Sequence, residues 1–75
     1  MESIREALDL LRQQSVILSS LRPDSANRVR EERDLYLIRQ RLARYPAALQ
    51  AIAFAARELH RPVDTLSVRD VQRLM

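Results

Sequence analysis

The chain has 75 residues and no glycine, and this absence constrains the fold more than any other feature of the sequence. Tight turns and bulges of β-structure place residues at positive φ, where glycine is the default residue. Small strand-rich domains nearly always use glycine for that purpose, whereas helices have no need of it. Alanine, leucine and arginine, which are strong helix formers, are plentiful instead. We therefore predict an all-α fold.

Composition limits the size and the chemistry of that fold. The chain is 47% hydrophobic and 31% charged, which is typical of a folded domain. Cysteine is absent and histidine occurs once, so we expect no disulfide, no bound metal and no other cofactor. A single helical domain of residues 1–75 lies near the lower size limit for an independent core. A second copy commonly supplies the missing buried surface, so we expect a homodimer.

The spacing of apolar residues predicts four helices, with approximate ranges 2–21, 25–44, 46–60 and 67–74. The connection around Pro23 is short, so the first two helices are expected to form an N-terminal antiparallel hairpin. One or two shorter C-terminal helices then fold back on the hairpin or swap onto a second subunit. The expected caps are Ser3 with Glu6, Asp24 or Ser25, and Ser67.

The first helix carries two adjacent apolar stripes. One stripe is formed by Ile4, Leu8, Leu11 and Leu18, and the other by Ala7, Leu10, Ile17 and Leu21. Together the stripes are wider than the contact with one neighbouring helix requires. We expect this helix to contact either two neighbours or a partner chain.

The core stripe of the second helix continues across Pro46 at the same three- and four-residue steps. It contains Leu35, Ile38, Leu42, Tyr45, Leu49, Ile52, Ala56 and Leu59. The uninterrupted phase favours one long kinked helix, whereas the residue before a proline disfavours helical geometry. A break at Tyr45–Pro46 is the preferred interpretation, and the kinked helix remains the alternative.

Four arginines fall within one narrow arc of the second helix, at about 100° per residue. They are Arg30, Arg33, Arg41 and Arg44, and Leu37 lies inside the arc. The functional interpretation is a basic strip that meets an acidic protein surface or phosphates. The structural interpretation is a solvated face, paired with Glu31, Glu32 and Asp34 or with the first helix. An exposed Leu37 would favour an interface, because apolar and arginine side chains together form interface cores.

A second small apolar patch, on the back of the same helix, contains Val29, Tyr36 and Ala43. Two interpretations of this patch remain open. In the first, the patch contacts the C-terminal segment of its own chain. In the second, it forms a dimer seam or a groove for a partner helix.

Residues 55–74 read AARELHRPVDTLSVRDVQRL. This segment resembles the helix-turn-helix of bacterial transcription regulators, in which an Ala-Ala-x-Glu-Leu helix end precedes a turn and a recognition helix. The resemblance implies that the recognition helix, the second helix of the motif, enters the major groove of DNA. The implied contacts to phosphates or bases are Arg57, Arg69, Gln72 and Arg73. His60 stands where the motif usually has glycine, and Pro62 lies within the connection.

No group of residues points to catalysis. His60 has no second histidine or cysteine beside it, the serines lack a recognisable base, and a glycine-rich phosphate loop is impossible here. We expect no enzymatic activity and no small-molecule substrate. No stretch approaches 18 apolar residues, and the first residues show no signal-peptide pattern. We therefore expect no membrane partner and a cytoplasmic location.

These observations lead to a small regulatory or antagonist protein that binds another protein. The expected contact residues are Arg30, Arg33, Tyr36, Leu37, Arg41 and Arg44. The alternative is a DNA-binding transcription regulator that uses residues 47–74. Size and composition associate the chain with the small regulators that bacterial mobile elements or phages encode.

Overall fold

The computed structural model describes residues 3–22, 24 and 26–74. Over these residues the elements are α1 (Ile4–Ser20), α2 (Arg28–Leu42), α3 (Pro46–Leu59), the 3₁₀ helix η1 (Val63–Thr65) and α4 (Val68–Arg73). No strand occurs among them, so the all-α prediction is confirmed. None of the described helices combines the length and the apolar character that crossing a membrane requires.

α1 begins where the sequence places a cap. The backbone N–H of Glu6 donates a hydrogen bond of 3.1 Å to Oγ of Ser3, and Ser3 is extended, as N-cap residues usually are. The Glu6 carboxylate was expected to bond back to Ser3, but it accepts a hydrogen bond from the hydroxyl of Tyr45. The predicted first residue of this helix, Glu2, lies outside the described residues. At the other end, Leu21 is extended and closes the helix.

α2 starts later than the sequence predicts. Its first residue is Arg28 and its N-cap is Asn27, so the predicted start at about residue 25 and the predicted cap at Asp24 are wrong. Pro23 and Ser25, on which that prediction also rested, lie outside the described residues. The connection between α1 and α2 is therefore longer than the sequence suggests.

The helical structure is interrupted before Pro46, and the alternative of one long kinked helix is wrong. α2 ends at Leu42, and α3 begins with Pro46 at its first position. Proline has no N–H to donate to the Leu42 carbonyl, and the N–H of Tyr45 donates to that carbonyl at 2.9 Å. Tyr45 leaves the helical region, with φ −125° and ψ 52°. Arg44 consequently lies in the turn and not on α2, where it was predicted.

α3 ends in a left-handed turn made without glycine. His60 adopts φ 53° and ψ 44°. Its N–H donates to the carbonyl of Arg57 at 3.4 Å, and the N–H of Arg61 donates to the carbonyl of Ala56 at 3.1 Å. This pair of bonds is a Schellman motif, and Pro62 follows it, as proline often does after a helix end. Histidine is one of the residue types that tolerate positive φ better than most.

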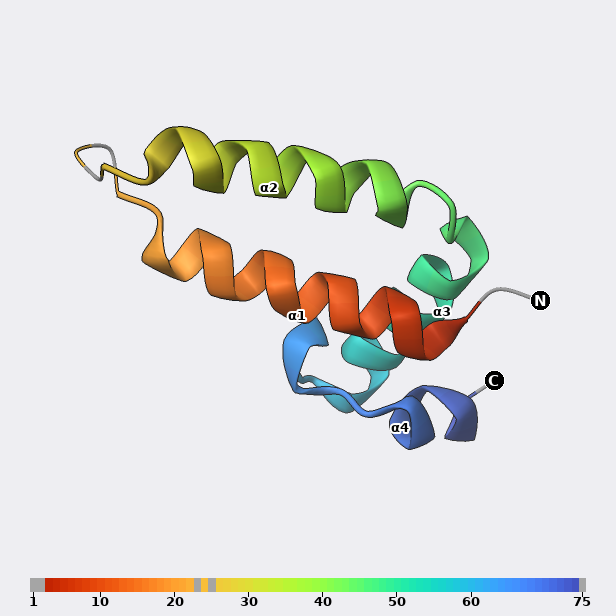
Figure 1. The fold of residues 1–75 in the computed structure, drawn as a ribbon. Helices are drawn as coiled ribbons and strands as arrows, with labels where there is room; N and C mark the ends of the chain where they lie inside the picture. Colours follow the sequence, from red (N-terminus) through yellow and green to blue (C-terminus); the bar gives the residue numbers. More distant parts are fainter. Residues whose placement is uncertain (1–2, 23, 25, 75) are drawn as a thin grey trace.

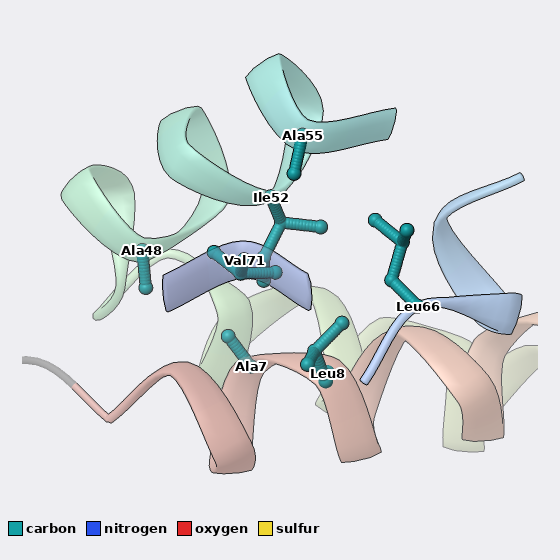
Figure 2. Packing of buried hydrophobic residues seen from close by; sticks show 7 residues of the cluster. All are labelled: Ala7, Leu8, Ala48, Ile52, Ala55, Leu66 and Val71. Atoms are coloured by element: carbon teal, nitrogen blue, oxygen red, sulfur yellow. The ribbon is translucent and has the colours of Figure 1, made fainter. Parts of the chain in front are cut away.

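The main core lies between α1, α3 and the C-terminal residues (Figure 2). Its buried members are Ala7, Leu8, Ala48, Ile52, Ala55, Leu66 and Val71. Three of the seven are alanines, and their small side chains let α1 and α3 approach closely. Leu8, Ile52, Leu66 and Val71 are the largest fully buried side chains. Because Leu66 and Val71 belong to this core, residues 61–74 are part of the fold and not a tail.

A second, smaller core joins α1 to α2. It contains Leu10, Ile38 and Leu42, with Ile17 and Leu49 partly buried against it. α1 contacts α2 through residues that include Leu10 and Ile17, and it contacts α3, η1 and α4 on a side that includes Ala7 and Leu8. The prediction that α1 has two neighbours is confirmed, although the two predicted stripes do not each serve one neighbour. Figure 1 shows α1 and α2 side by side, with α3 and α4 packed near the N-terminal half of α1. Leu18, at the far end of α1, was expected in the core but is 49% exposed.

Candidate functional site

A shallow groove runs between α1 and α2, and it contains several of the predicted contact residues. It consists of two hollows that share Gln13 and Arg41. The first has a volume of about 420 Å³ and is lined by Glu6, Asp9, Leu10, Gln13, Arg41, Arg44 and Tyr45. The second has a volume of about 200 Å³ and is lined by Gln13, Ile17, Asp34, Leu37, Ile38 and Arg41. We call the two together the α1–α2 groove.

The apolar part of the groove surrounds Leu37. This side chain is 50% exposed although it is a leucine on a helix that packs against a neighbour. It lies beside Ile17 of α1, with buried Ile38 next to it. Val16, 67% exposed, lines a neighbouring hollow of about 340 Å³ together with Gln13 and Ile17. The groove thus offers apolar surface that its own chain leaves uncovered.

The four arginines of the predicted strip separate into two pairs. Arg41 and Arg44 line the groove. Arg30 and Arg33 are exposed on α2 but do not line either hollow. None of the four forms an ion pair within the described residues. Glu32 pairs instead with Arg28 at 2.9 Å. The four arginines are solvent-exposed, as the structural interpretation expects, and Glu6, Asp9 and Asp34 line the same hollows as Arg41.

The carboxylates at the other end of the groove already have partners in the chain. Glu6 accepts the hydroxyl hydrogen bond of Tyr45, and Asp9 lies 3.8 Å from Nη1 of Arg12. The bond to Glu6 is the main reason that the pKa of Tyr45 is raised above 10.0, with desolvation and the Glu6 charge adding to it. This contact fixes the break between α2 and α3 against the first turn of α1.

Tyr36 was predicted as a contact residue, but the structure does not place it in the groove. It is 61% exposed, and Val29 is 79% exposed on the same helix. The interpretation that this patch contacts the C-terminal segment of the same chain is wrong, since α2 packs mainly on α1. Val29, Tyr36 and Ala43 form an uncovered patch, which we call the outer α2 patch.

The residues implied by the helix-turn-helix resemblance are all exposed, but they do not gather at one place. Arg69 and Gln72 line a hollow of about 470 Å³ between α1 and α4, together with Arg5 and Arg12. Arg57, on α3, and Arg73, near the end of α4, do not line it. Arg69 and Gln72 were predicted as contact residues only because of the motif. The contribution of Arg5 and Arg12 of α1 to this hollow was not predicted.

The geometry of the C-terminal segment departs from a helix-turn-helix. Residues 60–67 connect α3 to α4 and include η1, whereas the motif uses a turn of about three or four residues. α4 spans only six residues. A full capping box at its start joins Ser67 to Asp70, and Nη1 of Arg61 lies 3.4 Å from Asp70. The hydrogen bonds from Ser67 are the main reason that the pKa of Asp70 is lowered, with the charges of Arg61 and Arg73 adding to it.

Five α1 side chains line the groove but were not predicted as contact residues, namely Glu6, Asp9, Leu10, Gln13 and Ile17. Leu10 and Ile17 were assigned to an apolar stripe, and no sequence signal indicated that Gln13 would border the groove. Elsewhere, the described residues contain no group of three or more His, Cys, Asp or Glu side chains that could hold a metal ion. His60 is exposed at the end of α3.

Comparison with known proteins finds no matching family model, no matching curated protein and no matching solved structure.

Proposed function

We propose that this chain is a non-enzymatic regulatory or antagonist protein that acts by binding another protein in the α1–α2 groove. One observation carries the proposal: Leu37 is half exposed beside Ile17, and the neighbouring Arg41 and Arg44 have no carboxylate partner in the described chain. An apolar anchor flanked by arginines is the composition typical of an interface core.

The energetics of this surface favour a ligand with both apolar and polar groups. Complete burial of a leucine stabilises by about 1.5–3 kcal/mol, so covering the exposed half of Leu37 contributes about 1 kcal/mol. Arginine guanidinium groups add directional, charge-assisted hydrogen bonds to a carboxylate or a carbonyl oxygen. Neither contribution alone gives a stable complex. A partner that makes both contacts gains binding affinity from the apolar contact and a defined orientation from the hydrogen bonds.

A peptide-display selection tests the proposal without knowledge of the partner. The full chain is the bait, and recovered clones are counter-screened against Leu37→Asp and against the control Arg39→Glu, an exposed residue of α2 that lines neither hollow. We expect clones that bind the wild type and Arg39→Glu but lose binding to Leu37→Asp. If no recovered clone depends on Leu37, the groove is not a protein-binding site.

The proposal includes an N-terminal antiparallel hairpin formed by α1 and α2, and a homodimer. The side-by-side packing of the two helices supports the hairpin (Figure 1). The outer α2 patch supports the homodimer, because Val29, Tyr36 and Ala43 recur every seven residues and remain uncovered. A stripe with this repeat runs along one side of a helix and suits packing against a second helix.

DNA binding is the second candidate function. The observation that favours it is the hollow between α1 and α4, where Arg5, Arg12 and Arg69 come together with Gln72. If the chain binds duplex DNA, its affinity falls steeply with salt and falls further in the double variant Arg5→Ala, Arg69→Ala, which removes two arginines of this hollow. Fluorescence anisotropy with a labelled duplex at 50 and 200 mM salt measures both effects. Weak binding that the double variant leaves unchanged excludes this candidate.

A further inference from the structure

We propose that the hollow between α1 and α4 binds the phosphate group of a small phosphate monoester, with Arg5 on one wall and Arg69 on the other. This inference goes beyond the proposed function, because Asp9 is the only residue that the hollow shares with the α1–α2 groove. It also differs from the DNA candidate, because the phosphates of a nucleic-acid backbone are diesters with one negative charge each.

The hollow has a size typical of a small-molecule site. Its volume is about 470 Å³, and small-molecule pockets usually measure about 300–1,000 Å³. The lining residues come from two parts of the chain that pack on the same core; they are Arg5, Leu8, Asp9 and Arg12 of α1, and Ser67, Val68, Arg69 and Gln72 of the C-terminal segment.

The two walls of the hollow are joined by a hydrogen bond. Nη2 of Arg12 donates to the carbonyl of Leu66 at 2.5 Å, directly before Ser67. Leu66 is fully buried in the main core, so this carbonyl has a fixed position. Arg12 therefore holds the α1 wall against the beginning of the C-terminal wall. A site whose walls are held by the fold binds its ligand without the cost of ordering them.

The charge of the hollow suits an anion. Three arginines line it against one carboxylate, which gives a net charge of +2. That carboxylate belongs to Asp9 and lies 3.8 Å from Nη1 of Arg12, so these two charges compensate each other. Arg5 and Arg69 form no ion pair and no side-chain hydrogen bond within residues 3–22, 24 and 26–74. Two guanidinium groups of the hollow thus remain without an anion.

The C-terminal wall adds neutral donors and no carboxylate. Oγ of Ser67 accepts the N–H of Asp70 at 3.2 Å, and the hydroxyl hydrogen of Ser67 has no acceptor among the described residues. Gln72 contributes a side-chain amide. The carboxylate of Asp70 does not line the hollow, since it accepts the N–H of Ser67 and lies 3.4 Å from Nη1 of Arg61.

A phosphate monoester matches these groups better than a carboxylate does. Its phosphate carries nearly two negative charges at neutral pH and has three terminal oxygens. Arginine binds such oxygens in pairs, so one phosphate has acceptors for both Arg5 and Arg69. A carboxylate has one charge and two oxygens in one plane, which a single arginine satisfies.

An NMR titration of the full chain tests the inference. The probe is methyl phosphate at about pH 7.5, where it is a dianion because the second pKa of a phosphate monoester is about 6. The comparators, at the same ionic strength, are dimethyl phosphate, which is the monoanionic diester of nucleic acid, and acetate. The Nε–Hε signals of the arginines report contact at individual guanidinium groups.

We expect millimolar methyl phosphate to shift the Arg5 and Arg69 signals saturably, with about tenfold higher affinity than dimethyl phosphate or acetate. The double variant Arg5→Ala, Arg69→Ala should lose this binding by about tenfold or more. Arg57→Ala is the control, because Arg57 is an exposed arginine of α3 outside the hollow, and this variant should bind as the wild type does. Arg12 stays unchanged because its hydrogen bond to Leu66 supports the hollow.

The altered side chains are exposed, and the backbone spectrum of each variant verifies that it folds. The absence of a saturable shift, equal affinity for the three anions, or undiminished binding by the double variant overturns the inference. Duplex DNA that binds through Arg5 and Arg69 while methyl phosphate does not bind assigns the hollow to nucleic acid, which also overturns it. Peptide clones that depend on Leu37 are unaffected by these results, so failure here leaves the proposed function standing.

Discussion

The hydroxyl of Tyr45 donates a hydrogen bond to the carboxylate of Glu6, 39 residues earlier in the sequence. Tyr45 occupies the break between α2 and α3, and Glu6 lies in the first turn of α1. This contact holds one end of the α1–α2 groove together and links the two hydrophobic cores at the point where the chain changes direction.

The Tyr45–Glu6 hydrogen bond should make the protein less stable at alkaline pH. The folded state raises the pKa of Tyr45 above 10.0, mainly because the hydroxyl donates to Glu6. The contribution of the Tyr45 hydroxyl to the free energy of unfolding is therefore fully present below pH 10 and is lost as the pH rises through the raised pKa. Urea unfolding between pH 7 and pH 11 should show this loss in the wild type and not in Tyr45→Phe. Tyr36→Phe is the matched control, and an identical pH profile for Tyr45→Phe and wild type would contradict the assignment.

The capping box of α4 should make the protein less stable at acidic pH. The pKa of Asp70 is lowered, mainly by hydrogen bonds from Ser67. The contribution of Asp70 is present above the ordinary carboxyl pKa and is lost as the pH falls through the lowered value. Asp70→Asn should flatten the acid limb of a thermal-stability profile. Ser67→Ala keeps the backbone N–H that donates to Asp70, so it should retain most of that limb while it reduces the free energy of unfolding by about 1 kcal/mol. An unchanged acid limb in Asp70→Asn would show that Asp70 is not engaged in solution.

Replacement of His60 by glycine should stabilise the protein. A residue with a Cβ in the left-handed region costs about 1–2 kcal/mol, and glycine removes that cost but loses about 0.5–1 kcal/mol through its freedom in the unfolded chain. The expected net gain for His60→Gly is therefore about 0.5–1 kcal/mol by urea denaturation. Ala53→Gly, on the exposed side of α3, is the control and should lower stability by about 1 kcal/mol. A loss in both variants would mean that the His60 side chain contributes more than its backbone conformation costs.

The outer α2 patch should determine the oligomeric state. If Val29 and Tyr36 form the seam of a homodimer, Tyr36→Asp shifts the protein from dimer to monomer in light scattering coupled to size exclusion, while helicity is retained. Phe54→Asp, at an exposed site on α3, is the control that should leave the dimer intact. A wild-type monomer over the accessible concentration range would refute the homodimer.

The sequence predicts local features of this fold well because they depend on near neighbours. The caps at Ser3 and Ser67 follow from three-residue spacings, and the break at Pro46 follows from the missing N–H of proline. The buried stripe of Leu35, Ile38 and Leu42 follows from helical periodicity. In each case one helix turn contains the physical cause.

The groove could not be predicted because it depends on how α1 and α2 are rotated against each other. Leu37 and Arg41 were recognised on one helix, but only packing brings them beside Gln13 and Ile17 of the other. Arg44 was assigned to the helix because its position was extrapolated at 100° per residue past Leu42, where the helix ends. The exposure of Leu18 likewise depends on where α3 and α4 stop covering α1.

The position of α1 among the other elements has a consequence for biosynthesis. Leu8, near the start of the chain, is buried against residues from α3 and against Leu66 and Val71. The hydrogen bond from Ser15 to Asp64 also joins α1 to residues synthesised much later. A nascent chain therefore leaves the ribosome with its first helix still exposing leucine side chains to solvent or to chaperones. The native core closes only after the residues around Val71 have emerged, so folding is completed after translation of this segment and not during it.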